Sequence, residues 1–412
     1  MSARGANRII ARSAVVGLSV AALTLSGCSS TSGGSDGTLT GGGDPSGSSG
    51  SGTSGTDSAA SIAFNVKDHA ESVGVDTPVT VTAENGTLSA VSVKVGAGNQ
   101  TLDGAMSSDE EIWTARDLLE PGKAYHVRAT AVSADGAETT RKASFRSQDL
   151  TLDEQTFPSI SPLQGETVGV GMPAIIQFDV PVTNRASIER HLSVTSSPKV
   201  VGSWHWISDN EVHWRPKRYW PSGAKVTVHA DINSVPAGNG IFGQEDRSAS
   251  FVIGDSVIDK INIRTDEMQV WVNGKLARTI PITGGKPGWE TRSGTKLIME
   301  KIAKKRMDAA TVGIQPDDPE YYNIPDVRFA MRVTYSGEFL HAAPWSVSDQ
   351  GVDNVSHGCV GMNTANAKWL FGISHRGDPV QVRGTSRPIE PGNGWTDWDM
   401  SFKQYKAGSA LQ

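Results

Sequence analysis

Cysteine is scarce in this chain, which has two among 412 residues, Cys28 and Cys359. Their wide separation excludes the paired CxxC spacing of structural zinc sites. Long hydrophobic runs are also missing, because the longest one is too short to cross a bilayer comfortably. Basic residues are not in excess, since the formal net charge is −6, and no basic patch stands out. The sequence therefore predicts no metal, no cofactor, no nucleic-acid partner and no electrostatic attraction to an anionic lipid surface.

The first 27 residues have the pattern of a signal peptide. Three arginines lie at its start, and the short apolar run Ala14–Leu25 follows them. The next residues, Leu25-Ser26-Gly27-Cys28, resemble a bacterial lipobox. That resemblance implies cleavage before Cys28 and attachment of lipid to its sulfur. We expect a protein held at the cell membrane by this anchor and facing the cell wall; the alternative is an ordinary signal peptide with an incidental cysteine.

Use of Cys28 as an anchor leaves Cys359 without an intramolecular partner. An exported protein that keeps one unpaired thiol in an oxidising compartment needs a reason for it. One interpretation is a buried, inert cysteine. The other is a catalytic nucleophile.

The chain is long for a single core, and its composition divides it into several parts. A flexible linker rich in Gly, Ser and Thr is predicted after the anchor. Short strands rich in Val and Thr, separated by turn residues, then predict two immunoglobulin-like β-sandwiches and a β-rich third domain with one short helix after Cys359. The predicted parts are a signal peptide (1–27), the lipidated cysteine and linker (28–58), immunoglobulin-like domains (59–147 and 148–254), a catalytic domain (255–383) and a C-terminal subdomain (384–412).

Tryptophans gather in the second predicted sandwich. They are Trp204, Trp206, Trp214 and Trp220. A carbohydrate-stacking platform and an aromatic core that also contacts the next domain both fit this pattern, and we favour the core.

The segment Val355–Asn363 has the composition of a nucleophile with a base. Cys359 follows His357 by two residues, and His341 lies on a predicted strand upstream. His341 is the better base, because a side chain two residues from the cysteine is awkwardly placed to face its sulfur. Asp349, Asp353 or a backbone carbonyl near His341 would orient the imidazole.

A predicted helix after Cys359, with Asn363 as its N-cap, suggests a further effect. Unpaired N–H groups at the helix start would lower the pKa of the thiol and bind a developing oxyanion.

A family resemblance appears at these residues. His341, the 14 residues after it and Ser356-His357-Gly358-Cys359 match the signature of L,D-transpeptidases with a YkuD-type catalytic domain. The similarity also covers Tyr335-Ser336-Gly337, His341–Val347, Asn366–Trp369, Arg376-Gly377-Asp378 and the tail Trp395–Gly408. Nearly everything after Cys28 resembles a mycobacterial-type L,D-transpeptidase lipoprotein with two immunoglobulin-like domains.

The resemblance implies a reaction and its residues. Cys359 would attack the carbonyl between the third residue, a diaminopimelate, and the terminal D-alanine of a peptidoglycan tetrapeptide stem. D-Ala would leave a thioester, which the side-chain amine of an acceptor stem resolves as a 3→3 cross-link. His341 would be the base, with His357 and Gly358 shaping the loop and the oxyanion site. Carbapenem-type β-lactams would inhibit the enzyme. The substrate-binding residues implied are Tyr335, Ser336, Gly337, Ala342, Trp345, Ser356 and Gly361.

Two positions depart from the family pattern. Ala342 replaces the usual Ser, a position that orients the base through its carbonyl, and Gly361 replaces the usual Asn. A lid is expected within residues 303–325, with Tyr321 or Tyr322 near substrate. Two other functions fit the same residues: an L,D-carboxypeptidase, in which water resolves the thioester, and a non-catalytic scaffold that binds peptidoglycan.

Overall fold

The computed structural model describes residues 59–412, and most of its regular structure is β-strand. The mainly β fold class predicted from the sequence is therefore confirmed. The predicted signal peptide, Cys28 and the linker lie outside the described residues and stay predictions. None of the helices within 59–412 has the length and apolar character needed to span a membrane.

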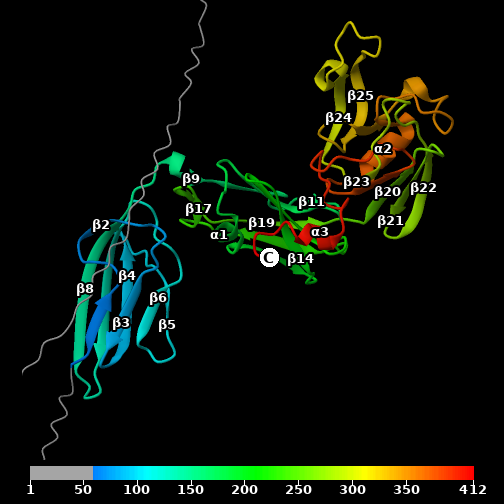
Figure 1. Cartoon of the computed structure of the whole chain (residues 1–412). Helices are drawn as coiled ribbons and strands as arrows, with labels where there is room; N and C mark the ends of the chain where they lie inside the picture. The colour runs from blue at the N-terminus through cyan, green and yellow to red at the C-terminus, as the bar shows by residue number, and fades with distance from the viewer. Residues whose placement is uncertain (1–58) are drawn as a thin grey trace, which may run out of the picture. The chain divides into compact units, whose positions relative to one another are not determined.

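The first β-sandwich consists of two four-stranded sheets (Figure 1). Its core includes Trp113, Tyr125 and Phe145, and the two latter rings stack with centroids 5.0 Å apart. One sheet has the order β1 (Ser61–Phe64), β3 (Thr80–Glu84), β6 (Ile112–Ala115) and β5 (Gly104–Met106); the other has the order β2 (Ala70–Val73), β8 (Glu138–Ser147), β7 (Ala124–Val132) and β4 (Thr87–Val95).

The second β-sandwich has the same two-layer construction. The four tryptophans of this region are buried in its core, and the rings of Trp214 and Trp220 stack. This confirms the aromatic core. Its sheets have the orders β10 (Pro158–Ser161), β12 (Ala174–Phe178), β15 (Glu211–Pro216), β14 (Gly202–Ser208), and β11 (Thr167–Val168), β19 (Arg247–Ile253), β16 (Lys225–Ala230), β13 (Leu192–Ser197). Smaller elements are η1 (Leu152–Glu154), β9 (Gln155–Thr156), α1 (Arg185–Glu189), β17 (Pro236–Gly238) and β18 (Ile241–Gly243).

The third part contains a five-stranded and a four-stranded sheet that share one hydrophobic core. Helix α2 contributes Ala367 and Leu370 to this core and lies between the β24–β25 hairpin and strands β20–β22 in Figure 1. The sheets have the orders β22 (Lys275–Pro281), β21 (Glu267–Val272), β20 (Val257–Asn262), β28 (Pro379–Arg383), β23 (Gly294–Leu297), and β24 (Glu300–Asp308), β25 (Asn323–Arg332), β26 (Phe339–Ala342), β27 (Val360–Met362). Between them lie η2 (Ala309–Val312), η3 (Pro344–Ser346) and α2 (Thr364–Ile373).

Local sequence explains two features of this part. Asn273 and Gly274 have φ values of 50° and 78°, the left-handed pair that a tight hairpin turn requires, and they join β21 to β22. The side chain of Asn363 accepts a hydrogen bond from the backbone N–H of Asn366 at 2.9 Å. Asn363 is therefore the N-cap of α2, as predicted.

The C-terminal segment packs against the second sandwich. Helix α3 (Phe402–Lys406) is capped by Ser401 and contacts β14. The imidazole of His205 donates a hydrogen bond to the Tyr405 carbonyl at 2.7 Å, and buried His213 lies 2.8 Å from the Asp397 carboxylate. The predicted domain boundaries are not tested by these contacts.

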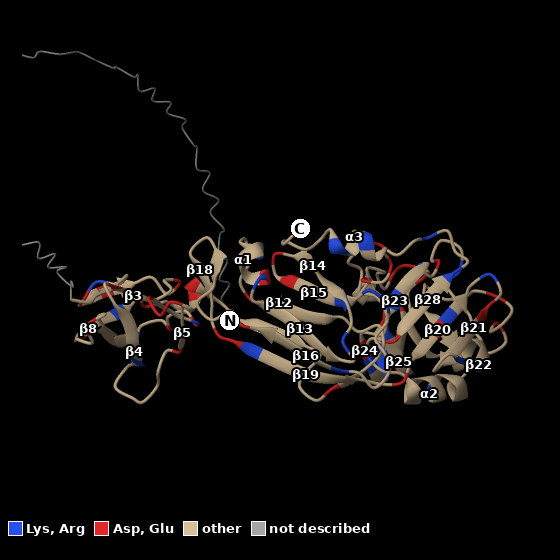
Figure 2. Ribbon diagram, turned by 90° about the horizontal axis from the view of Figure 1, so that it is seen from below, with Lys and Arg blue, Asp and Glu red and all other residues tan. Residues whose placement is uncertain are grey.

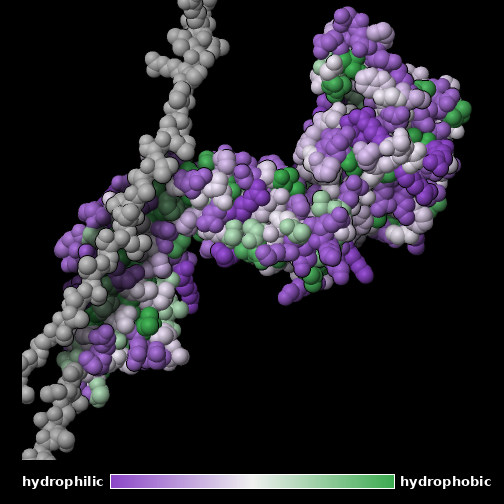
Figure 3. Space-filling model, viewed as in Figure 1, coloured by the Kyte–Doolittle hydropathy of each residue, from purple (hydrophilic) through white to green (hydrophobic). Residues whose placement is uncertain are grey.

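Charged side chains of both signs are interspersed over the described residues in Figure 2. The face drawn in Figure 3 is mostly hydrophilic, with hydrophobic residues gathered below the tip of the β24–β25 hairpin. The cavity that holds the cysteine lies in this hairpin's neighbourhood, since Met307 and Ile324 of the two strands line it.

Candidate active site

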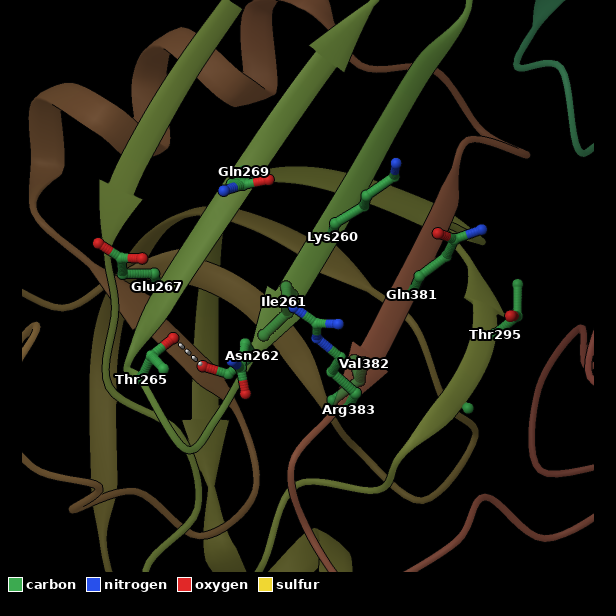
Figure 4. A pocket seen from close by; sticks show the side chains of 11 residues that line it. Lys260, Ile261, Asn262, Thr265, Glu267, Gln269, Thr295, Gln381, Val382 and Arg383 are labelled. Carbon is green, nitrogen blue, oxygen red and sulfur yellow. Dashed lines mark hydrogen bonds between the residues drawn. The ribbon is translucent and has the colours of Figure 1, made fainter. Parts of the chain in front are cut away.

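One sizeable cavity lacks the chemistry of the predicted reaction. It measures about 640 Å³ and lies on the five-stranded sheet. Figure 4 shows Lys260, Gln269, Gln381 and Thr295 projecting from neighbouring strands there. Its lining includes neither a cysteine nor a histidine. The reaction site must therefore lie elsewhere.

A smaller cavity of about 300 Å³ brings the predicted nucleophile and base together. Strand β26 pairs in parallel with β27, which places His341 opposite Gly361. Cys359 directly precedes β27, two residues before Gly361, so it lies on the same side of the sheet as His341. The cavity is lined by Thr283, Met307, Tyr322, Ile324, His341, Ala343, Trp345, Ser346, Val355, Ser356, His357, Cys359 and Gly361.

His341 is held in the form that a general base requires. Its Nδ1 donates a hydrogen bond to the carbonyl of Ala342 at 2.9 Å, which leaves Nε2 as the basic nitrogen. Burial lowers its pKa, so the imidazole is neutral near pH 7. The indole of Trp345 stacks on the ring, with centroids 5.8 Å apart. Of the orienting groups left open by the sequence, the backbone carbonyl is the one used, and the suggestion of Asp349 or Asp353 is wrong.

Cys359 is protonated in the resting site. Its side chain is buried, and burial raises the pKa of the thiol to about 12. The sulfur donates a weak hydrogen bond to the carbonyl of Gly337 at 3.6 Å. The expected lowering of this pKa by a helix start is wrong, because strand β27 separates Cys359 from α2, which begins only at Thr364.

His357 belongs to the cavity wall and is bonded to an acid. Its Nε2 donates to Glu320 Oε2 at 2.7 Å. The ring packs against Trp289 and Tyr322, each with a centroid separation of 5.0 Å. This geometry supports His341 rather than His357 as the base.

The loop before Cys359 is shaped by Ser356 and Gly358. The Ser356 hydroxyl donates to the Cys359 carbonyl at 2.6 Å and accepts from the Gly358 N–H at 3.1 Å. Gly358 has a φ of 114°, a conformation that other L-residues rarely adopt. The loop therefore has a fixed conformation that depends on glycine at this position.

Gly361 leaves no room for a larger residue. A Cβ atom there would lie 2.8 Å from the Cβ of Ala343 and 3.1 Å from the Cγ2 of Thr283. Gly361 also exchanges two backbone hydrogen bonds with Thr283, both of 2.9 Å. Thr283 and Ala343 thus occupy the space into which a side chain at 361 would project.

The remaining predicted substrate residues lie in different places. Tyr335 and Gly337 line a second cavity of about 330 Å³, separate from the first but sharing Met307 and Tyr322 with it. The Ser336 hydroxyl instead accepts a hydrogen bond from the Asn393 side-chain amide, and the Ala342 side chain is buried in the core. Neither Ser336 nor Ala342 lines the two cavities.

The predicted lid supplies residues in or near the two cavities, and the sequence singled out only some of them. Of the two lid tyrosines considered, Tyr322 lines both cavities, whereas the Tyr321 hydroxyl contacts Asn323. Met307 and Glu320 carried no distinguishing sequence signal. Their roles depend on how the β24–β25 hairpin folds over the loop that holds His357.

Comparison with known proteins identifies the family. Residues 258–382 match the model of the L,D-transpeptidase catalytic domain, and residues 70–236 match that of a bacterial Ig domain. L,D-transpeptidase 2 of Mycobacterium tuberculosis is 35% identical, over 85% of this chain and 85% of that protein. L,D-transpeptidase 5 of the same species is 32% identical, over 86% of this chain and 78% of its own length. A solved structure of LdtMt1 in complex with imipenem has 36% identity and a TM-score of 0.48, and covers 55% of this chain and 97% of its own. With such similarity extending well beyond the catalytic residues, the chain belongs to the L,D-transpeptidase family.

Proposed function

We propose that this L,D-transpeptidase forms 3→3 cross-links between peptidoglycan stem peptides through a thioester on Cys359. The observation that carries the proposal is the state of His341. Its Nδ1 is fixed by the Ala342 carbonyl, which leaves Nε2 as the basic nitrogen, and His341 lines the cavity that also holds the only described thiol.

The first half of the reaction acylates the cysteine. His341 Nε2 takes the thiol proton as the sulfur attacks the carbonyl between diaminopimelate and D-alanine. Collapse of the tetrahedral intermediate breaks the peptide bond, and the departing amine of D-Ala takes the proton from His341. Because the resting thiol is protonated, His341 has to remove this proton for the sulfur to attack.

The second half transfers the acyl group to another stem. The side-chain amine of the acceptor's diaminopimelate attacks the thioester carbonyl carbon. The C–S bond breaks, an amide forms, and the amine's proton returns to the sulfur by way of His341. Cys359 lines the first cavity, and the second cavity, which shares Met307 and Tyr322 with it, is the proposed place for the other stem.

Binding of carbapenem-type β-lactams belongs to the same proposal. Opening of the strained ring by the thiol would acylate Cys359 as the stem carbonyl does. Gly361 lines the same cavity, so it would offer a bound inhibitor no side-chain contact at this position.

Attachment to the membrane is a separate part of the proposal. The lipobox-like Leu25-Ser26-Gly27-Cys28 supports a lipid anchor on Cys28 and a position facing the cell wall. Radiolabelled palmitate incorporated by the wild type and not by Cys28→Ser would support it; equal labelling of both would contradict it.

Product analysis tests the cross-linking reaction. The purified chain is incubated with disaccharide tetrapeptide, and the products are separated by mass spectrometry. We expect a 3→3 dimer and free D-Ala from the wild type and neither from Cys359→Ala. Tripeptide alone would favour the carboxypeptidase, and a chain that binds peptidoglycan but forms no product would favour the scaffold.

A further inference from the structure

One carboxylate joins the lid to the loop that carries the nucleophile. The lid (residues 303–325) contains the end of β24, η2 and the start of β25. Glu320 lies in it, and its Oε2 accepts hydrogen bonds from His357 Nε2 at 2.7 Å and from the ammonium of Lys286. His357 and Lys286 belong to two different segments outside the lid.

These two partners are themselves connected. The backbone N–H of Lys286 donates to the carbonyl of Ser356 at 2.9 Å, next to His357. The Lys286 ammonium and the His357 imidazole hold the pKa of Glu320 below its usual range, so the carboxylate is charged at neutral pH. Glu320 therefore bonds to two segments, one at Lys286 and one at His357, that are joined to each other by a backbone hydrogen bond.

The lid covers the cavity next to this contact. Tyr322, two residues after Glu320, packs on His357 and lines the cavity that contains Cys359. Burial raises the pKa of the Tyr322 hydroxyl to about 12, so its ring forms an uncharged wall. Separation of Glu320 from His357 would draw Tyr322 away and admit water.

Access of water to the cavity decides which product the reaction gives. A thioester on Cys359 has two fates. Attack by an amine nitrogen breaks the C–S bond and gives an amide, whereas attack by a water oxygen breaks the same bond and gives a carboxylic acid; each nucleophile loses one proton, which returns to the thiolate. Which product forms depends on how well the closed lid excludes water.

We propose that the contact of Glu320 with His357 and Lys286 is a latch that holds the lid closed over the acylated cysteine and sets the ratio of cross-linked to hydrolysed product. The inference rests on the proposed thioester. Glu320 is a positioning residue in this account, because it acts through the lid and through His357 and does not contact the reacting atoms.

The test uses three variants of the full chain. Glu320→Ala removes the latch, and Glu320→Gln keeps an acceptor for His357 but loses the charge that pairs with Lys286. Asp317→Asn is the matched control, since Asp317 is an exposed carboxylate on the same lid segment. Each protein is acylated with tetrapeptide donor, and the decay of the acyl-enzyme is followed by intact-protein mass spectrometry with and without acceptor stem.

We expect the dimer-to-tripeptide ratio to fall by about fivefold in Glu320→Ala, the size expected for loss of a partly exposed ion-pair network. The fall comes from faster decay in water alone, with acylation changed by less than about twofold. Glu320→Gln falls in between, and Asp317→Asn matches the wild type.

An unchanged ratio in Glu320→Ala overturns the latch, as does an equal fall in Asp317→Asn. Slower acylation with the same ratio also overturns it, because Glu320 would then act on the first step. A wild type that forms no acyl-enzyme contradicts the proposed function instead, so the two failures can be told apart.

Discussion

Asparagine at position 361, the residue that the family resemblance implies there, is expected to destabilise this protein. Gly361 is in strand β27 and its backbone has no left-handed strain, so the obstacle is space. The new Cβ would lie 2.8 Å from the Cβ of Ala343. Real Cβ contacts do not become this short, and Ala343 has no flexible side chain that can turn away.

The magnitude follows from overpacking. Extra atoms forced into a packed site typically cost about 1–3 kcal/mol. Gly361→Ala introduces the same Cβ without the amide, and its lower unfolded-state entropy offsets the cost by about 0.4–1 kcal/mol. We therefore expect Gly361→Asn to be destabilised by about 1–3 kcal/mol and Gly361→Ala by less.

The assay follows exposure of Cys359 to a chromogenic thiol reagent in increasing urea. A Cys28→Ser background makes Cys359 the only thiol of the 412-residue chain, so the signal reports the catalytic domain. Ala343→Gly removes the closest contact. The double variant Ala343→Gly/Gly361→Asn should therefore lose about 1 kcal/mol less free energy of unfolding than the two single variants lose together.

Equal stability of Gly361→Asn and the wild type would refute this reasoning, because the wall formed by Ala343 and Thr283 would then yield freely. Additive single and double variants would refute the assignment to Ala343. Either result would mean that the glycine reflects something other than packing.

Three further predictions concern buried titratable groups. Lys296→Met should lower the free energy of unfolding, measured in urea, by about 3 kcal/mol, because Lys296 Nζ pairs with buried Glu338 at 2.6 Å. A loss of under about 1 kcal/mol would contradict this, and Lys304→Met, at an exposed lysine, is the control. Burial raises the thiol pKa of Cys359 to about 12 on folding. The contribution of this thiol to the free energy of unfolding should therefore be complete below its unfolded pKa of about 8.5 and decline as pH rises above that value, since the unfolded chain then binds fewer protons than the folded one. The free energy of unfolding of Cys359→Ala should decline less with pH, and parallel curves for the variant and the wild type would disprove this. Burial lowers the pKa of His341. The rate of acylation should therefore persist below pH ~6.5 and fall only under more acid conditions. A pH–rate profile whose acid limb is centred above that pH would argue against a neutral buried base.

Much of the fold can be predicted from local patterns in the sequence. The short strands of the two sandwiches, the helix after Cys359 and its cap Asn363 each depend on residues close together in the chain. His341 was preferred over His357 for a similar reason, because chain geometry limits what a side chain two residues away can face.

Other parts of the site depend on contacts between distant segments. Glu320 reaches His357 across 37 residues, and no periodicity marks a lone glutamate in a loop as a partner. The error about the thiol pKa has the same origin. A three-residue strand, Val360–Met362, forms because it pairs with β26, and its presence moves the helix start away from Cys359.

The central claim is that Cys359 forms the thioester with His341 as its base. Intact-protein mass spectrometry with tetrapeptide donor, followed by peptide mapping, measures this most directly. The account predicts an adduct equal to the donor less D-Ala on the peptide containing Cys359, formed by the wild type, strongly slowed in His341→Ala and absent in Cys359→Ala. An adduct that persists in Cys359→Ala, or forms at the wild-type rate in His341→Ala, would contradict it.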